Sequence, residues 1–153
     1  MLTISDTLRL RPYDGQHDFA LAWYQDPELV YLVDGIKEPY TKEKLDRMYH
    51  YLNTHGELYF IEMKIDGQFQ PVGDVTLMKE DLPIVIGVKD CQHQGLGRQV
   101  VRALMEKART AHFDHLGVDC IYFYNLPSQK LFEGLGFKRI QTTSKGYRYR
   151  YDF

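Results

Sequence analysis

The sequence predicts an α+β (α/β-like) protein whose helices flank a central twisted sheet, mixed but mostly antiparallel, of about six or seven strands. Three observations predict this class. Residues 7–11 alternate polar and apolar side chains, as a strand with one buried face does. Residues 58–65 and 71–78 are rich in strand-forming residues on either side of Asp66-Gly67, a typical hairpin turn. Residues 83–88 form a short apolar run that leads through a glycine loop into a long amphipathic helix.

Helices are predicted between the first strand and the hairpin. Apolar side chains recur at helical spacing from Asp14 to Tyr24, and Asp26-Pro27 then allows a second short helix over residues 28–33. Thr41 is a suitable N-cap for a third helix, which should end at His55-Gly56.

The second half should begin with a strand-helix-strand unit. The apolar run at 83–88 is expected to be buried on both faces, the helix after the glycine loop to end near Gly117, and residues 118–124 to form a parallel strand reached by a right-handed crossover. A short helix over 127–135 and two strands, 137–143 and 147–153, complete the prediction.

Length and composition predict one domain, residues 1–153. The chain has 153 residues, 44% apolar and 26% charged, and a formal charge of −2. No basic field favours nucleic acid, no apolar run could span a membrane, and no signal peptide is recognisable, so we expect a cytoplasmic protein without nucleic-acid or membrane partners. Cys91 and Cys120 are too few and too far apart for a disulfide scaffold or a zinc site, so no metal is expected.

The glycine loop carries the clearest functional signal. Gln92-His93-Gln94-Gly95-Leu96-Gly97 stands between a strand and a helix N-terminus, where unpaired backbone N–H groups and the helix dipole favour an anion such as phosphate. Glycines let the main chain approach phosphate oxygens, and Arg98 adds a positive charge. Two glycines alone are equally compatible with a tight structural turn.

A second motif follows at fixed spacing: Asn125, Ser128, Phe132-Glu133 and Gly136-Phe137. Together with Gln92, Gly95 and Gly97 this order resembles the GNAT N-acetyltransferases. Residues 72–138 carry the resemblance, and the N-terminal half is more loosely similar to the branch that contains ribosomal-protein and aminoglycoside acetyltransferases.

The resemblance implies the GNAT fold, acetyl-CoA as cosubstrate and a set of residues that contact it. It implies that backbone groups of residues 86–88 pair with the pantetheine arm and that residues 92–98 hold the pyrophosphate. Residues that follow the strand at 118–124 are implied to flank the cofactor. These cofactor-binding residues are Ile86, Gly87, Val88, Gln92, His93, Gln94, Gly95, Leu96, Gly97, Arg98, Asn125, Ser128 and Phe132.

Catalytic groups are less clear. The acceptor amine must lose a proton, the thioester carbonyl needs a hydrogen-bond donor, such as the Val88 N–H, and the thiolate needs a proton. The position where the family often has tyrosine is Phe132, so Tyr122 or Tyr124 is the candidate acid, with water as an alternative. Residues 84–88 contain no carboxylate. Asp74 is therefore the candidate base, while Glu80 and Asp81 fit a solvated turn.

Aromatic residues provide candidates for the acceptor site. Trp23, Tyr24 and Tyr31 lie in the segment that covers the acceptor in this family, although such rings also pack helices onto sheets. Tyrosines alternate with arginines over residues 147–151, and an edge strand of this kind could pair with a second copy in a homodimer.

The sequence thus predicts an N-acetyltransferase that moves acetyl from acetyl-CoA to a primary amine of a small molecule or a protein N-terminus. Direct attack in a ternary complex is favoured over a route through Cys91 or Cys120. The alternative from another class is a catalytically weak acyl-CoA-binding sensor or partner subunit.

Overall fold

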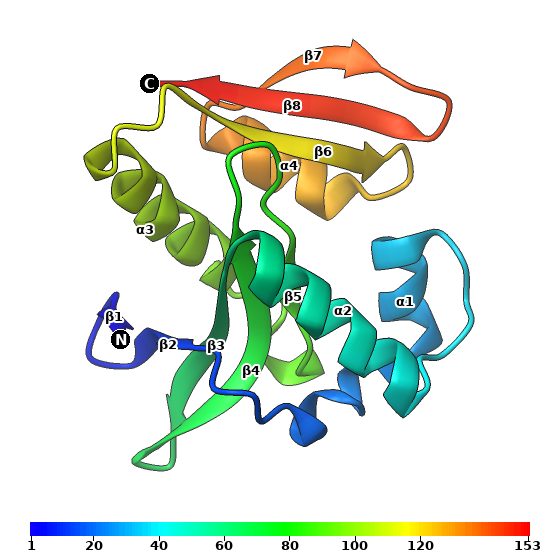
Figure 1. Ribbon diagram of the computed structural model, residues 1–153, viewed down its shortest axis with the longest axis vertical. Helices are drawn as coiled ribbons and strands as arrows, with labels where there is room; N and C mark the ends of the chain where they lie inside the picture. The colour runs from blue at the N-terminus through cyan, green and yellow to red at the C-terminus, as the bar shows by residue number, and fades with distance from the viewer.

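The computed structural model describes residues 1–153 and contains two antiparallel sheets. Figure 1 shows the second sheet lying across one end of the first. The first has the order β1 (Leu2–Thr3), β2 (Leu8–Pro12), β3 (Glu57–Ile65), β4 (Gln68–Leu77), β5 (Ile84–Ile86), and the second β6 (His115–Tyr122), β8 (Gly146–Asp152), β7 (Lys138–Thr142). The α+β class with mostly antiparallel strands is confirmed, and the predicted hairpin is the β3–β4 pair.

The expected parallel pairing across the glycine loop is wrong, because β5 and β6 belong to different sheets. The connection between β4 and β5 instead bonds to the start of β6. The N–H of Gly117 donates to the carbonyl of Lys79 at 2.7 Å, and a Cβ at Gly117 would lie 3.1 Å from the carbonyl oxygen of Glu80. This close approach takes the place of a ladder between the strands.

Four α-helices pack on the sheets: α1 (Pro27–Asp34), α2 (Lys42–His55), α3 (Leu96–Thr110) and α4 (Leu126–Gly134). Thr41 caps α2, as predicted, and Asp26 caps α1, each by accepting a hydrogen bond from a backbone N–H group of the first turn. The helix expected from Asp14 is replaced by two 3₁₀ turns, Asp18–Ala20 and Trp23–Gln25.

Helix α3 ends earlier than predicted. His112 adopts a φ of 65°, and the N–H of Phe113 turns back to the carbonyl of Ala108 at 3.0 Å. The chain therefore leaves the helix before Gly117, which lies inside β6.

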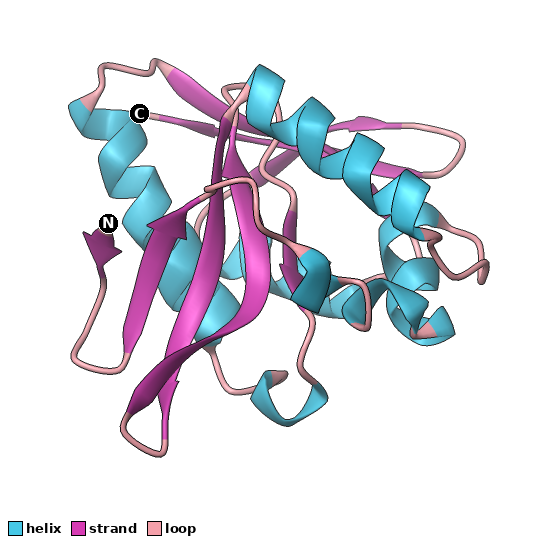
Figure 2. Cartoon of the chain, turned by 60° about the horizontal axis from the view of Figure 1, so that its bottom comes forward, coloured by secondary structure: helices cyan, strands magenta, loops and turns pink.

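Alternate side chains of β3 enter two separate cores, one on each face of the first sheet. Tyr59 and Ile61 pack with α3, whereas Leu58 and Phe60 pack with α1 and α2. Figure 2 shows α2 and α3 on opposite sides of this sheet. No helix has the length and apolar character needed to cross a bilayer.

Two strand predictions need correction. In β5 only Val85 is buried, because β5 is an edge strand that pairs with β4 on one side and with no strand on the other. The tyrosine-rich β8 is the central strand of the second sheet, so it offers no edge for a second copy. The outer edge is β7, whose residues are all exposed.

Candidate active site

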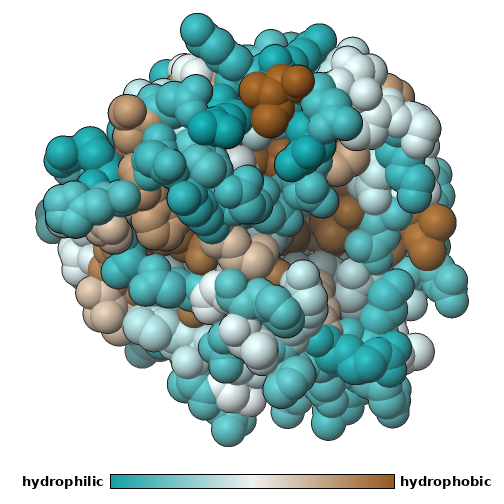
Figure 3. All heavy atoms as spheres, turned by 45° about the horizontal axis from the view of Figure 1, so that its top comes forward, coloured by the Kyte–Doolittle hydropathy of each residue, from teal (hydrophilic) through white to brown (hydrophobic).

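A cleft of about 540 Å³ separates β5 from β6. Helix α1 and the N-terminal ends of α3 and α4 supply further walls, so segments far apart in the sequence meet there. On the face shown in Figure 3, hydrophilic residues predominate, and most hydrophobic atoms lie in recesses between them. Of the predicted cofactor residues, the cleft is lined by Ile86, Gln92, His93, Gly95, Leu96, Gly97, Arg98, Asn125, Ser128 and Phe132.

The glycine loop is shaped for close approach of a ligand. Gly95, the N-cap of α3, has a φ of 78°, and a Cβ added there would meet nothing within 4 Å. No side chain caps α3, so its first-turn N–H groups have no side-chain partner. The side chain of Gln92 donates to the carbonyl of Ile86 at 2.9 Å and so fixes the loop to β5. An anion at this helix end would be favoured by the free N–H groups and by the dipole.

Other members of the loop have structural partners. Gly97 faces α4, where a Cβ would lie 3.3 Å from Leu131. Arg98 lines the cleft while donating to the carbonyl of Gly134 at 3.4 Å, which ties α3 to the end of α4. Gln94 donates to the carbonyl of Asp90 and lies outside the cleft lining.

The backbone N–H groups of β5 that do not bond to β4 belong to Ile84 and Ile86. Gly87 and Val88 both donate their N–H groups to the carbonyl of Val72, at 2.7 and 3.2 Å. The Val88 N–H is therefore engaged and cannot serve as the expected donor to a thioester. Because ladder bonds alternate along an antiparallel strand, the amides of Ile84 and Ile86 point away from β4, toward the cleft that both residues line.

None of the three aromatic residues predicted for the acceptor site, Trp23, Tyr24 and Tyr31, lines the cleft. Trp23 packs against Gly87 and is 7% exposed, and Tyr24 is 1% exposed. Neither forms part of the cleft wall. Tyr31 is half-buried, and its ring stacks on that of Tyr124 with centroids 4.3 Å apart.

Asp74 is buried on the α1–α2 side of β4, at 1% exposure. The hydroxyls of Tyr24 and Tyr49 donate to its Oδ2 at 2.6 and 2.8 Å. Burial raises the pKa of Asp74 to about 6, although the two hydrogen bonds act in the opposite direction. Asp74 does not line the cleft, so in this arrangement the two phenols separate it from any bound acceptor.

Tyr122 is the last residue of β6 and Tyr124 follows it, with their rings stacked at 5.4 Å, and neither residue lines the cleft. The Tyr124 hydroxyl donates to the carbonyl of Tyr31 at 2.8 Å, whereas the Tyr122 hydroxyl makes no hydrogen bond. Burial raises the pKa of both phenols. Asn125 follows, and its side chain caps α4 by accepting from the N–H of Ser128 at 3.3 Å.

The central pair of the second motif, Phe132 and Glu133, packs and bonds mainly with other parts of the protein. Phe132 is 2% exposed, lines the cleft and packs edge-on against Phe137. Glu133 points elsewhere, since it accepts hydrogen bonds from Arg139 at 3.1 Å and from the hydroxyl of Tyr149.

Asp81 is the residue that sequence reasoning missed. It lines the cleft, and its Oδ1 accepts the N–H of Leu82 at 3.0 Å and that of Asp119 at 3.1 Å. Neighbouring Glu80 is exposed and pairs with His115, as a turn residue would. Nothing local in the sequence separates these two acids, because the contact with Asp119 joins distant parts of the chain.

Both cysteines line the cleft, but neither is activated. Burial raises the pKa of the Cys91 and Cys120 thiols, which disfavours the nucleophilic thiolate.

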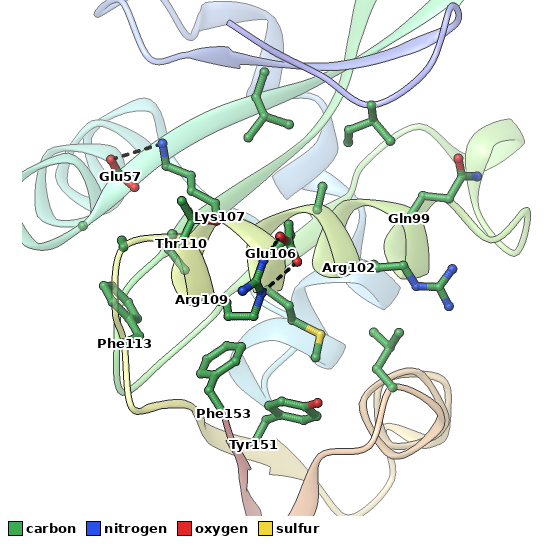
Figure 4. Close-up of a pocket in the computed structure, with 18 of the residues that line it drawn as sticks. Glu57, Gln99, Arg102, Glu106, Lys107, Arg109, Thr110, Phe113, Tyr151 and Phe153 are labelled. Atoms are coloured by element: carbon green, nitrogen blue, oxygen red, sulfur yellow. Dashed lines mark hydrogen bonds and ion pairs between the residues drawn. The ribbon is translucent and has the colours of Figure 1, made fainter.

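A second and larger hollow, about 1320 Å³, runs along α3 between β1 and the C-terminal end of β8. Figure 4 shows its charged side chains, among which Lys107 pairs with Glu57 and Arg109 with Glu106. None of the predicted site residues lines it. The smaller cleft is therefore the candidate active site.

Comparison with known proteins agrees with this geometry. Residues 7–138 match the family described as Acetyltransferase (GNAT) domain. No curated protein matches the sequence. Among solved structures, spermidine N-acetyltransferase from Vibrio cholerae, in complex with CoA and spermine, has a TM-score of 0.75 at 18% identity, covering 97% of this chain and 96% of that one.

Two further structures belong to the branch suggested by the sequence. Aminoglycoside acetyltransferase AAC(6')-Ib, in complex with coenzyme A, has a TM-score of 0.73 at 17% identity, with 95% of each chain covered. The Salmonella typhimurium acetyl transferase that modifies the N-terminal serine of ribosomal protein L7/L12 has a TM-score of 0.72 at 16% identity, covering 99% of this chain and 98% of that one. At such identities these likenesses establish the fold.

A cleft between two unpaired strand edges, with a glycine loop that opens a helix at one end, defines an acyl-CoA-binding transferase. The chain belongs to the GNAT acetyltransferase family. It is an acetyl-CoA-dependent N-acetyltransferase that uses acetyl-CoA as cosubstrate.

Proposed function

We propose that this enzyme transfers acetyl to a cationic primary amine, of a small molecule or a protein N-terminus, by direct attack in a ternary complex. The observation that carries the proposal is the arrangement of the cleft. Its glycine loop offers backbone N–H groups at one end of β5, and the free edge of β5 leads away from that loop to the carboxylate of Asp81. Phosphate binding and amine binding are thereby assigned to opposite ends.

The same features support our proposed position for the cosubstrate. Its pyrophosphate lies on the Gly95 loop, its pantetheine arm follows the free amides of Ile84 and Ile86, and Asn125, Ser128 and Phe132 flank it. Three predicted cofactor residues support this wall without facing the cleft. The N–H groups of Gly87 and Val88 donate to Val72, Gly87 also packs against Trp23, and the side chain of Gln94 donates to Asp90.

Direct attack requires an amine that has lost its proton and a carbonyl that can accept negative charge. In this proposal a β5 amide at Ile84 or Ile86 donates to the developing oxyanion. The leaving thiolate takes a proton from Tyr122, whose hydroxyl is free, or from water. Tyr124, whose hydroxyl is engaged, and buried Asp74 act indirectly by holding the surrounding aromatic side chains. The raised thiol pKa values argue against a covalent acetyl-cysteine.

Charge supports a cationic acceptor. Three acidic side chains line the cleft, and because Asp26 and Glu28 are paired with lysines, Asp81 is the one without a cationic partner. Spermine, bound in the Vibrio cholerae structure, is also a cationic amine. Tyr31, near the C-terminal end of α1, is proposed as an acceptor contact. Trp23 and Tyr24 are buried and support the site through packing.

Acetyl-CoA binding to wild type, Gly95→Trp and Gly15→Trp, measured by calorimetry, tests the placement of the cosubstrate. Both glycines have positive φ and open space around an added Cβ, so the two variants carry similar backbone strain. Loss of binding in Gly95→Trp alone supports the placement. Equal binding by all three proteins contradicts it.

Release of free CoA, followed with a panel of polyamines, aminoglycosides and peptides with free N-termini, tests the transfer step. Turnover with a cationic primary amine supports the proposal. Tight binding of acetyl-CoA without turnover on any amine would indicate a ligand sensor instead.

A further inference from the structure

Asp81 lies where the two sheets meet. It belongs to the connection between β4 and β5, at the end of β5 opposite the glycine loop, and lines the cleft with Pro83, Val118 and Cys120. Two hydrogen bonds hold β6 against the β4–β5 connection: the N–H of Asp119 donates to the side chain of Asp81, and the N–H of Gly117 donates to the carbonyl of Lys79. The carboxylate therefore stands at the closed end of the gap that the cosubstrate enters.

The two oxygens of this carboxylate have different surroundings. Oδ1 accepts both backbone hydrogen bonds, one from the start of β5 and one from β6. Oδ2 makes no hydrogen bond. It is not fully buried, so it retains some exposed surface. Asp81 is thus fixed in orientation through one oxygen, while the other is unbonded and partly exposed on a residue that lines the cleft.

The other ionisable groups of the cleft are less suited to take a proton at this end. Asp26 pairs with Lys89 at 3.6 Å and Glu28 with Lys37 at 3.3 Å. His93 and Arg98 belong to the glycine loop and its helix, and the two cysteines have raised thiol pKa values. Asp74, the base expected from the sequence, is shielded by two phenols.

We propose that Asp81 is the catalytic base that accepts the proton of the acceptor's ammonium group through Oδ2; this role rests on the proposed function above. An O–H bond forms as an N–H bond of the ammonium breaks, and the freed lone pair forms the N–C bond to the thioester carbonyl. The C–S bond breaks with its electron pair on sulfur. The nitrogen of the new amide then loses a second proton, and the leaving thiolate takes up one proton. Asp81 releases the proton that it accepted to solvent.

The electrostatic surroundings suit this role. Asp119 and Cys120 of β6 face Asp81, and Arg148 of β8 lies 3.7 Å from Asp119. Burial raises the pKa of Asp81, the carboxylate of Asp119 adds to this, and the two backbone hydrogen bonds oppose it. A raised pKa makes the carboxylate a better match for an ammonium donor.

Two substitutions separate a base from a structural clamp. Asp81→Asn keeps an oxygen that can accept the N–H groups of Leu82 and Asp119 but replaces the free oxygen by an NH₂ group. Asp81→Ala removes both functions. Glu80→Gln is the matched control, since this neighbouring acid is exposed and does not line the cleft.

We expect Asp81→Asn to bind acetyl-CoA within about twofold of wild type, to unfold at the wild-type temperature and to lose about 100-fold or more in kcat/KM at pH 7. The deficit should shrink as pH rises toward the pKa of a free alkylamine, about 10.4, because the amine then needs no base. Glu80→Gln should match wild type throughout.

Other outcomes overturn the assignment. Wild-type kcat/KM in Asp81→Asn, with loss only in Asp81→Ala, would make Asp81 a clamp and leave the proposed function intact. Loss of acetyl-CoA binding in Asp81→Asn, or a deficit independent of pH, would also remove its role as base. If wild type binds acetyl-CoA but acetylates no amine, the proposed function fails and the Asp81 assignment falls with it.

Discussion

The indole of Trp23 rests on the backbone of Gly87, so closely that a Cβ at position 87 would stand 2.2 Å from the Cγ of Trp23. This contact joins the 3₁₀ turn before α1 to the segment that follows β5. It supports the wall of the cleft that β5 forms, from the side facing away from the cleft.

Gly87→Ala should therefore destabilise the fold by overpacking, with a loss of about 1–3 kcal/mol in the free energy of unfolding. Urea denaturation measures this, and because Trp23 is the only tryptophan its fluorescence reports on the contact itself. In a Trp23→Leu background the same substitution should cost less. Equal costs in both backgrounds would show that the two residues are not coupled.

Asp74 should make stability depend on pH. Its folded pKa is raised to about 6 from 3.8, so the folded state holds its proton more tightly than the unfolded state does. Stability from this group is then fully present below about pH 4 and is lost as pH rises through 6, by about 3 kcal/mol in total. Asp74→Asn lacks this dependence.

The unfolding free energy of Asp74→Asn minus that of wild type should accordingly increase between pH 4 and pH 7. Chemical denaturation at several pH values provides the measurement. A difference that stays constant over this range would mean that the pKa of Asp74 is not raised in the folded protein.

Glu62 should be a larger contributor to stability than exposed acids are. It is 5% exposed and accepts hydrogen bonds from the Nε atoms of Arg9 at 2.8 Å and Arg11 at 2.9 Å. Glu62→Gln should lower the free energy of unfolding by about 2 kcal/mol, since charge-assisted bonds are lost near two cations. Asp14→Asn, which removes an exposed partner of Arg11, should cost less than about 1 kcal/mol.

The two tyrosines at the end of β6 should differ in their effect on turnover. Tyr122→Phe removes a hydroxyl that has no other partner and should lower kcat by about tenfold or more with little change in KM. Tyr124→Phe removes a hydroxyl already bound to the carbonyl of Tyr31 and should leave kcat nearly unchanged. Equal rates for wild type and Tyr122→Phe would identify water as the proton donor.

Local patterns predicted the elements that depend on neighbouring residues. Thr41 caps α2, as predicted, because a side chain and the N–H group three positions later are sufficient for a cap. The glycine loop was recognisable for the same reason, since Gly95 needs only its own positive φ to open α3.

Features that depend on distant contacts were not predictable. The burial of Asp74 follows from phenols on Tyr24 and Tyr49, contributed by segments that the alternating pattern of β4 does not encode. The role assigned to Asp81 depends on the N–H of Asp119, and the free edge of β5 depends on β6 joining another sheet.

The two-sheet arrangement also bears on aggregation. Unpaired strand edges invite pairing with other chains. Here β1 has only two residues and β7 carries Lys138 and Arg139, while the edges of β5 and β6 face a cleft beside α1 rather than open surface. The protein thus keeps backbone groups free for a ligand while denying a neighbouring molecule a long exposed edge on which to build a fibril.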